Sequence, residues 1–251
     1  MNTAEHSKTS PIYDLLYRCL SYCVHRLTAR NTLGHHIHSP YLYHLVRFIV
    51  YDTNPYYCFR NIEKQRQRLL RATKIISVID YGTGQSGQFS LQDIASRCLQ
   101  TREDAQLLFR LVNSHQPNNI LELGTSLGIT TAYLASVNNE NKVYTLEGSE
   151  ETLKEAKNVW KILHINNIIP VKGDIDETLS AFVQTYQNDN KDYPYIDFIL
   201  IDANHTEQAT LAYFHTLLPL CHDKTILVFD DIYHSLGMHR AWTQICQSEN
   251  V

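Results

Sequence analysis

One stretch, residues 119–135, constrains the fold of this chain more than any other: Asn-Ile-Leu-Glu-Leu-Gly-Thr-Ser-Leu-Gly-Ile-Thr-Thr-Ala-Tyr-Leu-Ala. A short apolar run leads through two glycines into a helical pattern, which predicts a buried strand, a tight turn and a helix. Gly124 and Gly128 would let the chain bend and its backbone approach a ligand closely. Glu122 lies at the end of the apolar run, where a carboxylate favours a cationic ligand group over a phosphate.

Downstream of residue 119, short apolar runs alternate with helical segments. Strands are expected at 119–123, 142–146, 168–171, 195–201 and 225–229. Helices are expected at 127–137, 150–164, 176–187 and 206–219, with a further helical segment at 237–246. Such alternation predicts an α/β fold with a doubly wound, mostly parallel Rossmann-like sheet.

Residues 1–100 read instead as helices that form an N-terminal cap or extension, and residues 101–251 read as the α/β domain. Helix starts are expected at three residues with good capping chemistry, Ser39, Ser90 and Thr101. A proline follows Ser39 directly, which strengthens that start signal. We expect this helical part to pack on the α/β part.

Charge is unevenly distributed along the chain. Residues 1–75 carry 11 Lys and Arg against 4 Asp and Glu, whereas the remainder carries 11 against 22. The basic excess is concentrated in one segment: Arg60, Lys64, Arg66, Arg68, Arg71 and Lys74. We interpret it as a solvated helix face, or one that docks on the acidic remainder, in preference to a contact for an anionic substrate or RNA. A nucleic acid therefore ranks behind a small molecule as the partner.

No apolar run in the sequence is long enough to cross a bilayer, and the first ten residues lack the apolar core of a secretory signal. The six cysteines are scattered without the close pairing that is typical of metal sites, which favours reduced thiols. We expect a cytoplasmic protein with no membrane partner.

A second glycine loop, in residues 76–87, competes with the loop at 124–128 because it also follows an apolar run. A nucleotide-type ligand needs a second strand that ends in an acid about 20 residues further on, to hold the ribose hydroxyls. Glu147 meets this need for the loop at 124–128, whereas two helices and no such strand follow the other loop. We predict that loop 124–128 binds the ligand. For residues 82–87 the sequence leaves three interpretations: a mobile segment, a lid near the site or a turn.

With Glu122, Gly124, Gly128 and Glu147 at these spacings, about residues 100–245 resemble the class I S-adenosylmethionine (SAM)-dependent methyltransferases. The resemblance implies that Glu122 lies near the cationic methionine end of the cofactor and that Glu147 accepts both ribose hydroxyls. It also implies that Asp174 lies in the segment that contacts the adenine. The expected cofactor contacts are Glu122, Gly124, Thr125, Ser126, Gly128, Glu147, Gly148, Asp174 and Asp202.

The ends of the fourth and fifth strands narrow the resemblance to catechol-type and macrolide-sugar-type O-methyltransferases. These ends read Asp202-Ala203-Asn204-His205 and Asp230-Asp231. The resemblance implies that Asp202, Asp230 and Asp231 are Mg²⁺ ligands and that His205, with Asp202, takes part in catalysis as the general base. A hard cation with oxygen ligands would lower the pKa of an acceptor hydroxyl and orient it. The Asp-Asp pair departs from the Asp-Asn of the catechol type.

Other roles stay open for the same residues. Asp202 could bind the amino end of the cofactor or cap the next helix, Asp231 could be an exposed loop acid, and His205 could be structural. His234 and His239 are weaker candidates for a base.

The chain stops at Val251, where family members usually add two further strands. We therefore expect a sheet of five strands in which strands six and seven are absent. A truncated chain, or an edge closed in another way such as a homodimer contact, would account for this.

The resemblance implies a SAM-dependent methyltransferase that O-methylates a small hydroxylated molecule, with Mg²⁺ as a candidate second cofactor. One alternative is an RNA methyltransferase that uses residues 60–74 for phosphate contacts. A second is an NAD-dependent dehydrogenase. Such an enzyme also has an acid that binds the ribose hydroxyls, but it prefers a third glycine in the loop and no acid at position 122. A third is a catalytically inactive SAM-binding or structural protein.

Overall fold

The computed structural model describes residues 11–28, 37–79 and 86–249. At its centre lies a five-stranded sheet, entirely parallel, with the strand order β5-β4-β3-β6-β7. Its strands are β3 (Asn119–Leu123), β4 (Lys142–Glu147), β5 (Ile168–Lys172), β6 (Phe198–Ile201) and β7 (Ile226–Phe229). The order reverses between β3 and β6, and the crevice at such a switch point is where open α/β sheets bind ligands. The predicted doubly wound α/β fold is confirmed.

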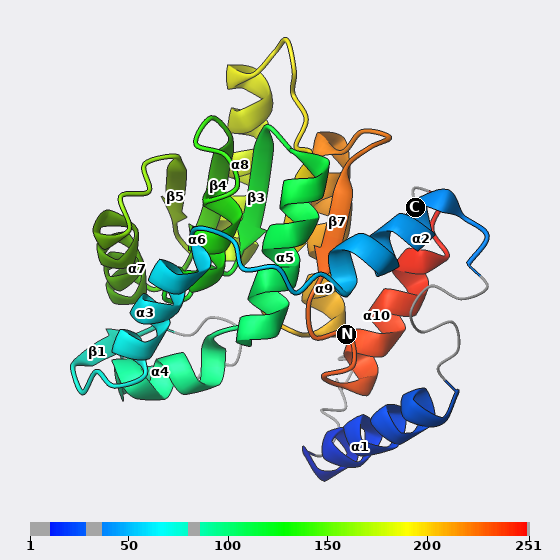
Figure 1. Cartoon of the computed structure of the whole chain (residues 1–251), viewed down its shortest axis with the longest axis horizontal. Helices are drawn as coiled ribbons and strands as arrows, with labels where there is room; N and C mark the ends of the chain where they lie inside the picture. The colour runs from blue at the N-terminus through cyan, green and yellow to red at the C-terminus, as the bar shows by residue number, and fades with distance from the viewer. Residues whose placement is uncertain (1–10, 29–36, 80–85, 250–251) are drawn as a thin grey trace, which may run out of the picture.

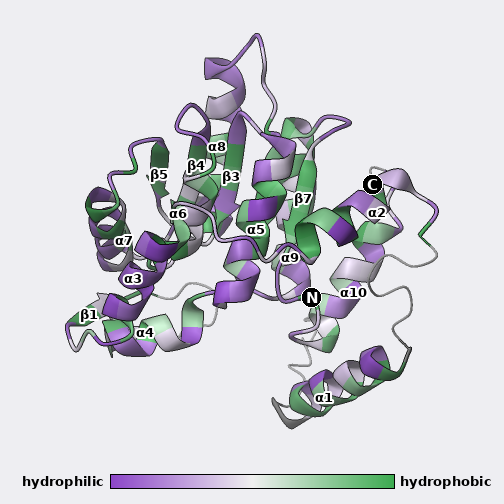
Figure 2. Ribbon diagram, viewed as in Figure 1, coloured by the Kyte–Doolittle hydropathy of each residue, from purple (hydrophilic) through white to green (hydrophobic). Residues whose placement is uncertain are grey.

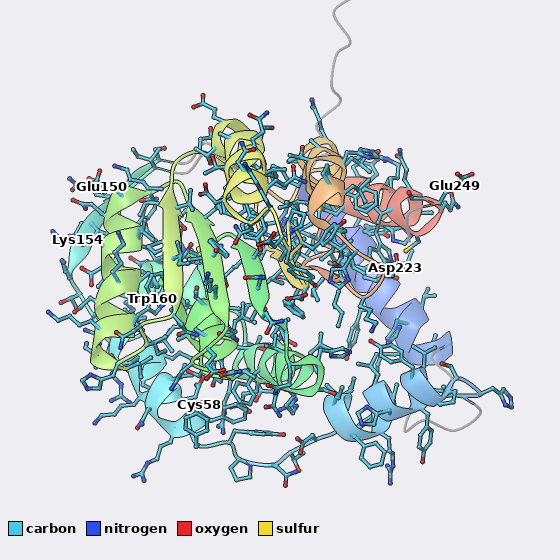
Figure 3. The ribbon with its side chains drawn as sticks, turned by 90° about the horizontal axis from the view of Figure 1, so that it is seen from above. Cys58, Glu150, Lys154, Trp160, Asp223 and Glu249 are labelled. Carbon is cyan, nitrogen blue, oxygen red and sulfur yellow. The ribbon has the colours of Figure 1, made fainter. Side chains whose placement is uncertain are left out.

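Helices cover both faces of this sheet (Figure 1). They are α5 (Arg102–His115), α6 (Ile129–Ala135), α7 (Glu150–Ile162), α8 (Ile175–Asp189), α9 (Glu207–Leu217) with the 3-10 turn η3 (Leu218–Leu220), and α10 (Leu236–Cys246). Seen from above, α8 and α9 lie on one side of the sheet and α5 on the other (Figure 3). Every strand and helix expected after residue 119 is present, with ends shifted by a few residues.

Apolar residues on both faces of the strands explain why the strands read as short continuous apolar runs. Ile120 and Phe198 are fully buried and pack with Leu134 beneath α5 and α6. Leu121 and Ile199, one residue further along their strands, are equally buried against α8 and α9. The hydrophobic colour of β5, β4 and β7 in Figure 2 follows this pattern.

The N-terminal part is mainly helical, as expected. It contains α1 (Pro11–Thr28), α2 (Pro40–His44) continued by the π-helical turn η2 (Leu45–Val50), α3 (Phe59–Leu69), β1 (Ile75–Val78), β2 (Gly87–Ser90) and α4 (Leu91–Cys98). The three predicted N-caps are confirmed. The side-chain oxygens of Ser39, Ser90 and Thr101 accept backbone N–H groups of the first helical turns at 3.3, 3.1 and 3.2 Å.

The expectation that strands six and seven are absent is not borne out. The described residues hold seven strands, because β1 and β2 form an antiparallel hairpin, with Ile75 opposite Ser90 and Val78 opposite Gly87. The central sheet has five strands, as expected, and the hairpin adds two strands in a separate sheet. The second strand of the hairpin was missed because its four residues include a glycine and end in the serine that caps α4, so they show no strand pattern.

The hairpin and α3 pack against the α/β part. Phe59 and Ile62 of α3 share one buried cluster with Tyr133 of α6 and Trp160 of α7. The backbone N–H of Ser77 in β1 donates to the Glu151 carboxylate of α7 at 2.6 Å. Among the described helices, none is long and apolar enough to cross a membrane.

Candidate functional site

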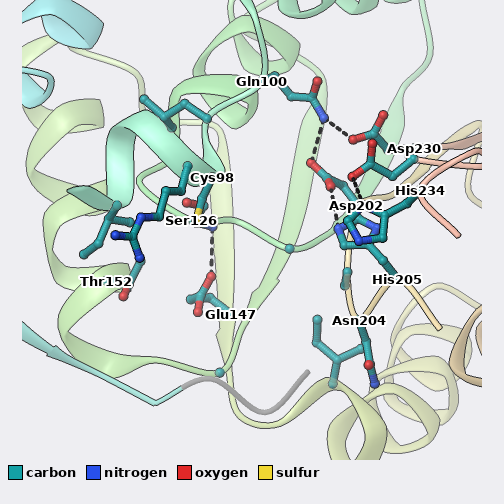
Figure 4. Close-up of a pocket in the computed structure, with 18 of the residues that line it drawn as sticks. Cys98, Gln100, Ser126, Glu147, Thr152, Asp202, Asn204, His205, Asp230 and His234 are labelled. Carbon is teal, nitrogen blue, oxygen red and sulfur yellow. Dashed lines mark hydrogen bonds and ion pairs between the residues drawn. The ribbon is translucent and has the colours of Figure 1, made fainter. Parts of the chain in front are cut away.

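A cavity of about 820 Å³ opens at the carboxyl ends of the parallel strands. The loops after β3, β4, β5, β6 and β7 supply one part of its wall, and residues 94–104, from α4 to the start of α5, supply another. Its polar lining residues include Gln100, Ser126, Glu147, Asp174, Asp202, Asn204, His205, Asp230, Asp231 and His234. Several of these residues are drawn in Figure 4. The volume is large enough for a cofactor-sized ligand.

The loop after β3 forms one wall because Gly124 lets it pass very close to β6. Gly124 has φ +99°, and a Cβ there would lie 2.0 Å from the carbonyl oxygen of Asp202. The next residues turn so that the Ser126 N–H donates to Oε2 of Glu147 at 2.8 Å. The Ser126 hydroxyl is buried, lines the cavity and has no hydrogen-bond partner among the described residues. A ligand in the cavity could satisfy that hydroxyl.

Glu122 lies beneath this loop and does not line the cavity. Its side chain is fully buried, and its Oε2 accepts hydrogen bonds from Thr131 at 2.5 Å and from Thr145 at 2.6 Å. Its Oε1 has no partner among the described residues. Burial raises the pKa of Glu122 to about 7. Thr125, also outside the cavity lining, shares a hydrogen bond of 2.6 Å with Thr145.

Gly128 is required by the close packing of its loop against α7. A Cβ at Gly128 would lie 2.6 Å from Nε1 of Trp160 in α7. That indole N–H donates to the Gly128 carbonyl at 2.8 Å. Gly124 lines the cavity, whereas Gly128 does not, and a contact of Gly128 with a ligand stays a prediction.

Glu147 and Asp174 both line the cavity from neighbouring strand ends. Glu147 ends β4, and its two carboxylate oxygens accept the backbone N–H groups of Ser126 and Ser149, each at 2.8 Å. These bonds fix the carboxylate in place at the wall of the cavity. Asp174 caps α8 and accepts the Asp176 N–H at 3.0 Å.

Asp202 and Asp230, which follow β6 and β7, lie side by side and share one partner. The side-chain amide of Gln100 donates to Oδ2 of Asp202 at 3.1 Å and to Oδ2 of Asp230 (Figure 4). Burial raises the pKa of Asp202 well above its ordinary value, and the neighbouring charge of Asp230 raises it further. The structure thus brings together two of the three predicted metal ligands.

Asp231 also lines the cavity but lies beside a different partner, His234. It adopts φ +53°, its side chain is 50% exposed, and its Oδ2 lies 3.6 Å from Nδ1 of His234. Among the described residues, no group of three or more His, Cys, Asp or Glu side chains is arranged to hold a metal ion. The predicted three-carboxylate site therefore does not fit a cation as arranged, because the half-exposed Asp231 carboxylate lies beside His234 and the Gln100 amide N–H₂ donates to the other two.

His205 lies beside the acid pair. Its Nε2 is 3.6 Å from Oδ1 of Asp202, and its ring centroid is 5.8 Å from that of His234. Burial lowers the pKa of His205, although the charges of Asp231 and Asp230 act in the opposite direction. A lowered pKa keeps the imidazole neutral near pH 7 and able to accept a proton.

Two parts of the site were not found in the sequence. Gln100 belongs to no sequence motif, because its hydrogen-bond partners lie more than 100 residues away in the chain. The second glycine loop lies mostly outside the described residues, so its predicted roles are untested. Val78 and Ile79, which precede it, line the cavity. No short-range sequence signal marks either contribution.

Comparisons with known proteins agree with this geometry. Residues 121–232 match a family model described as a methyltransferase domain. The O-methyltransferase from Bacillus cereus, solved in complex with S-adenosylhomocysteine (SAH), is 17% identical with a TM-score of 0.55, and the match covers 94% of this chain and 89% of that one.

Two further solved structures share the fold. TomG from Streptomyces achromogenes is an O-methyltransferase involved in tomaymycin synthesis, solved with SAM. It is 17% identical with a TM-score of 0.52, over 61% of this chain and 71% of that one. The SAH-bound methyltransferase PaMTH1 from Podospora anserina is 13% identical with a TM-score of 0.53, over 79% and 91%.

Proposed function

We propose that this protein transfers the methyl group of SAM to a hydroxyl oxygen of a small molecule, a proposal supported by the match of residues 121–232 to a family model described as a methyltransferase domain. One observation carries the proposal: Glu147, at the end of β4, and the His205–Asp202 pair, after β6, line the same cavity. A cofactor site and a proton acceptor therefore face one space.

In the cofactor half, three features fit SAM. The fixed carboxylate of Glu147 would accept the ribose hydroxyls, and the unpartnered Ser126 hydroxyl would bind a polar group of the cofactor. Gly148 and Asp174 line the adjoining wall, where we place the adenosine. Glu122 would act from below the loop, through its field and not by direct contact. SAM, when bound, supplies a methyl group on a positively charged sulfur, which is open to attack by an electron-rich oxygen.

In the acceptor half, the protein has to orient a hydroxyl group and take its proton. His205, neutral because burial lowers its pKa, would accept that proton at Nε2. The nearby Asp202 carboxyl would then stabilise the imidazolium that forms. Holding the hydroxyl in line with the methyl group would supply the remaining acceleration through proximity.

A small acceptor is favoured over RNA. The cavity of about 820 Å³ would hold the cofactor and a small molecule together. Arg66, from the basic segment, is buried and paired with Glu63 at 2.9 Å, so it cannot contact phosphates. The basic side chains of α3 do not line the cavity. RNA binding, if it occurred, would weaken steeply with salt.

Magnesium assistance is the alternative route for the acceptor half. Asp202 and Asp230 would be its ligands, and Gln100 would have to turn its carbonyl toward them. We favour the route through His205, because the Gln100 amide presents its N–H₂ to the two acids and Asp231 is paired with His234, which leaves an incomplete ligand set.

The test is methyl transfer from SAM labelled with tritium in the methyl group, offered to a panel of phenols, catechols, hydroxylated sugars and transfer RNA. We expect label in hydroxylated small molecules, at a rate unchanged by EDTA. A rate abolished by EDTA and restored by Mg²⁺ would favour the magnesium route. Label in RNA alone, or SAM binding without transfer to any acceptor, would contradict the proposed function.

A further inference from the structure

Gln100 joins three segments that are far apart in the chain. It lies between α4 and α5, and its amide donates to carboxylates that follow β6 and β7 (Figure 4). These two hydrogen bonds use both N–H groups of the amide. The side chain therefore acts as a clamp on the Asp202–Asp230 pair.

The direction of this amide is informative because its two ends are chemically opposite. An amide N–H₂ group satisfies carboxylate oxygens by donating to them. A cation between the same carboxylates would instead attract the amide carbonyl oxygen and exclude the N–H₂ group. With the donor inward, the amide itself occupies the space in which a cation would bridge the pair.

The backbone of Gln100 is anchored independently of its side chain. Its carbonyl oxygen accepts a hydrogen bond from the Arg66 guanidinium, whose side chain is only 7% exposed. Nε of Arg66 pairs with Oε1 of Glu63 at 2.9 Å, and the same oxygen accepts the Tyr133 hydroxyl at 2.8 Å. A chain of polar contacts thus runs from α6, which follows the loop after β3, through Glu63 and Arg66 to Gln100 and the acid pair. Because this anchor uses main chain, a change of the Gln100 side chain leaves it in place.

We propose that Gln100 is a positioning residue that bridges Asp202 and Asp230 in place of a divalent cation, so that this site needs no metal ion. The role that we give to this bridge rests on the proposed function, because the acid pair lies in the half of the cavity that we assign to the acceptor. The bridge holds Asp202 beside His205, where that carboxyl orients the imidazole. Without the Gln100 amide, the two adjacent carboxylates have no shared partner. A bound cation would then stabilise the pair.

The test is thermal unfolding of the full chain in EDTA and in millimolar Mg²⁺, without cofactor. The wild-type melting temperature should be the same in both buffers. Gln100→Glu places a third carboxylate against the pair, so its melting temperature in EDTA should fall by about 4 °C or more and recover in Mg²⁺. Gln92→Glu, on the exposed side of α4, is the matched control and should respond to neither condition.

Two results would overturn the inference. One is a wild-type protein that is stabilised by Mg²⁺ or binds one Mn²⁺ per chain by electron paramagnetic resonance. The other is a Gln100→Glu protein as stable as wild type in EDTA. Should Gln100→Glu fail to fold, Gln100→Ala replaces it and should likewise gain Mg²⁺-dependent stability. Failure of methyl transfer would contradict the proposed function but not this bridge, because unfolding reports on the carboxylates directly.

Discussion

The backbone N–H of Ser126 donates to Oε2 of Glu147 at 2.8 Å, which fastens the glycine loop after β3 to the acid that ends β4. The other oxygen of that carboxylate accepts the Ser149 N–H at the same distance. Two features that the sequence places about 20 residues apart therefore form a single wall of the cavity. The conformation of the loop and the position of the carboxylate depend on each other.

Substituting Gly124 by alanine should destabilise the fold and remove cofactor binding. Its φ of +99° disfavours any side chain, and a Cβ would overlap the Asp202 carbonyl oxygen at 2.0 Å, so backbone must move. We expect a loss of about 2 kcal/mol or more in the free energy of unfolding, measured by urea titration.

Gly237→Ala is the control for this substitution. Gly237 lies in α10, where a Cβ would lie no closer than 3.4 Å to Glu207, and alanine is a better helix former. Its stability should equal or exceed that of wild type. A Gly124→Ala protein as stable as Gly237→Ala would show that the approach to Asp202 is not tight.

Glu122 should make stability fall as pH rises. The pKa of its buried carboxyl is about 7 in the folded protein, above its ordinary value of 4.5. Between these two values the folded state holds a proton that the unfolded state has released, so each rise in pH favours unfolding. The stability present below pH 4.5 is lost as pH rises to about 7, a change on the order of 3 kcal/mol.

Comparing wild type with Glu122→Gln isolates this contribution, since the other titrating groups are common to both proteins. Glutamine keeps a carbonyl for Thr131 and Thr145 and cannot ionise. The difference in unfolding free energy between the two proteins should shift in favour of the variant from pH 4.5 to pH 8. A difference that stays constant with pH would mean that Glu122 ionises normally.

Substituting His205 by glutamine should slow methyl transfer without weakening SAM binding. Glutamine cannot take up the acceptor proton, and a general base typically contributes about 100- to 10,000-fold to the rate. His215→Gln, at an exposed position of α9, is the control and should leave the rate unchanged. A His205→Gln rate within a few fold of wild type would remove this residue from the proton step.

Much of the α/β part could be predicted because its signals are local. The runs at β3 and β6 are buried on both faces, and capping residues such as Ser90 and Thr101 act within one helical turn. The position of Glu122 was harder to predict. An acid at a strand end suits a ligand contact, yet strand alternation places it on the face of Ile120, under α6, where two threonines hold it.

The missed features depend on contacts between distant residues. Gln100 gains its partners only when the ends of β6 and β7 come together beside the segment between α4 and α5, and no local pattern encodes that meeting. Asp230 and Asp231 look equivalent in the sequence. In the fold, the left-handed backbone at Asp231 sends its side chain toward His234. Of the three predicted ligands, Asp202 and Asp230 are therefore bridged by Gln100, and Asp231 is half-exposed beside His234.

A calorimetric titration of SAH and of NAD into wild type and Glu147→Gln tests the cofactor site most directly. We predict that wild type binds one SAH per chain and does not bind NAD. The variant should bind SAH about tenfold more weakly or worse, because a charged acceptor for the ribose hydroxyls is lost. Preferential binding of NAD, or SAH binding undiminished in Glu147→Gln, would contradict the assignment of this cavity to SAM.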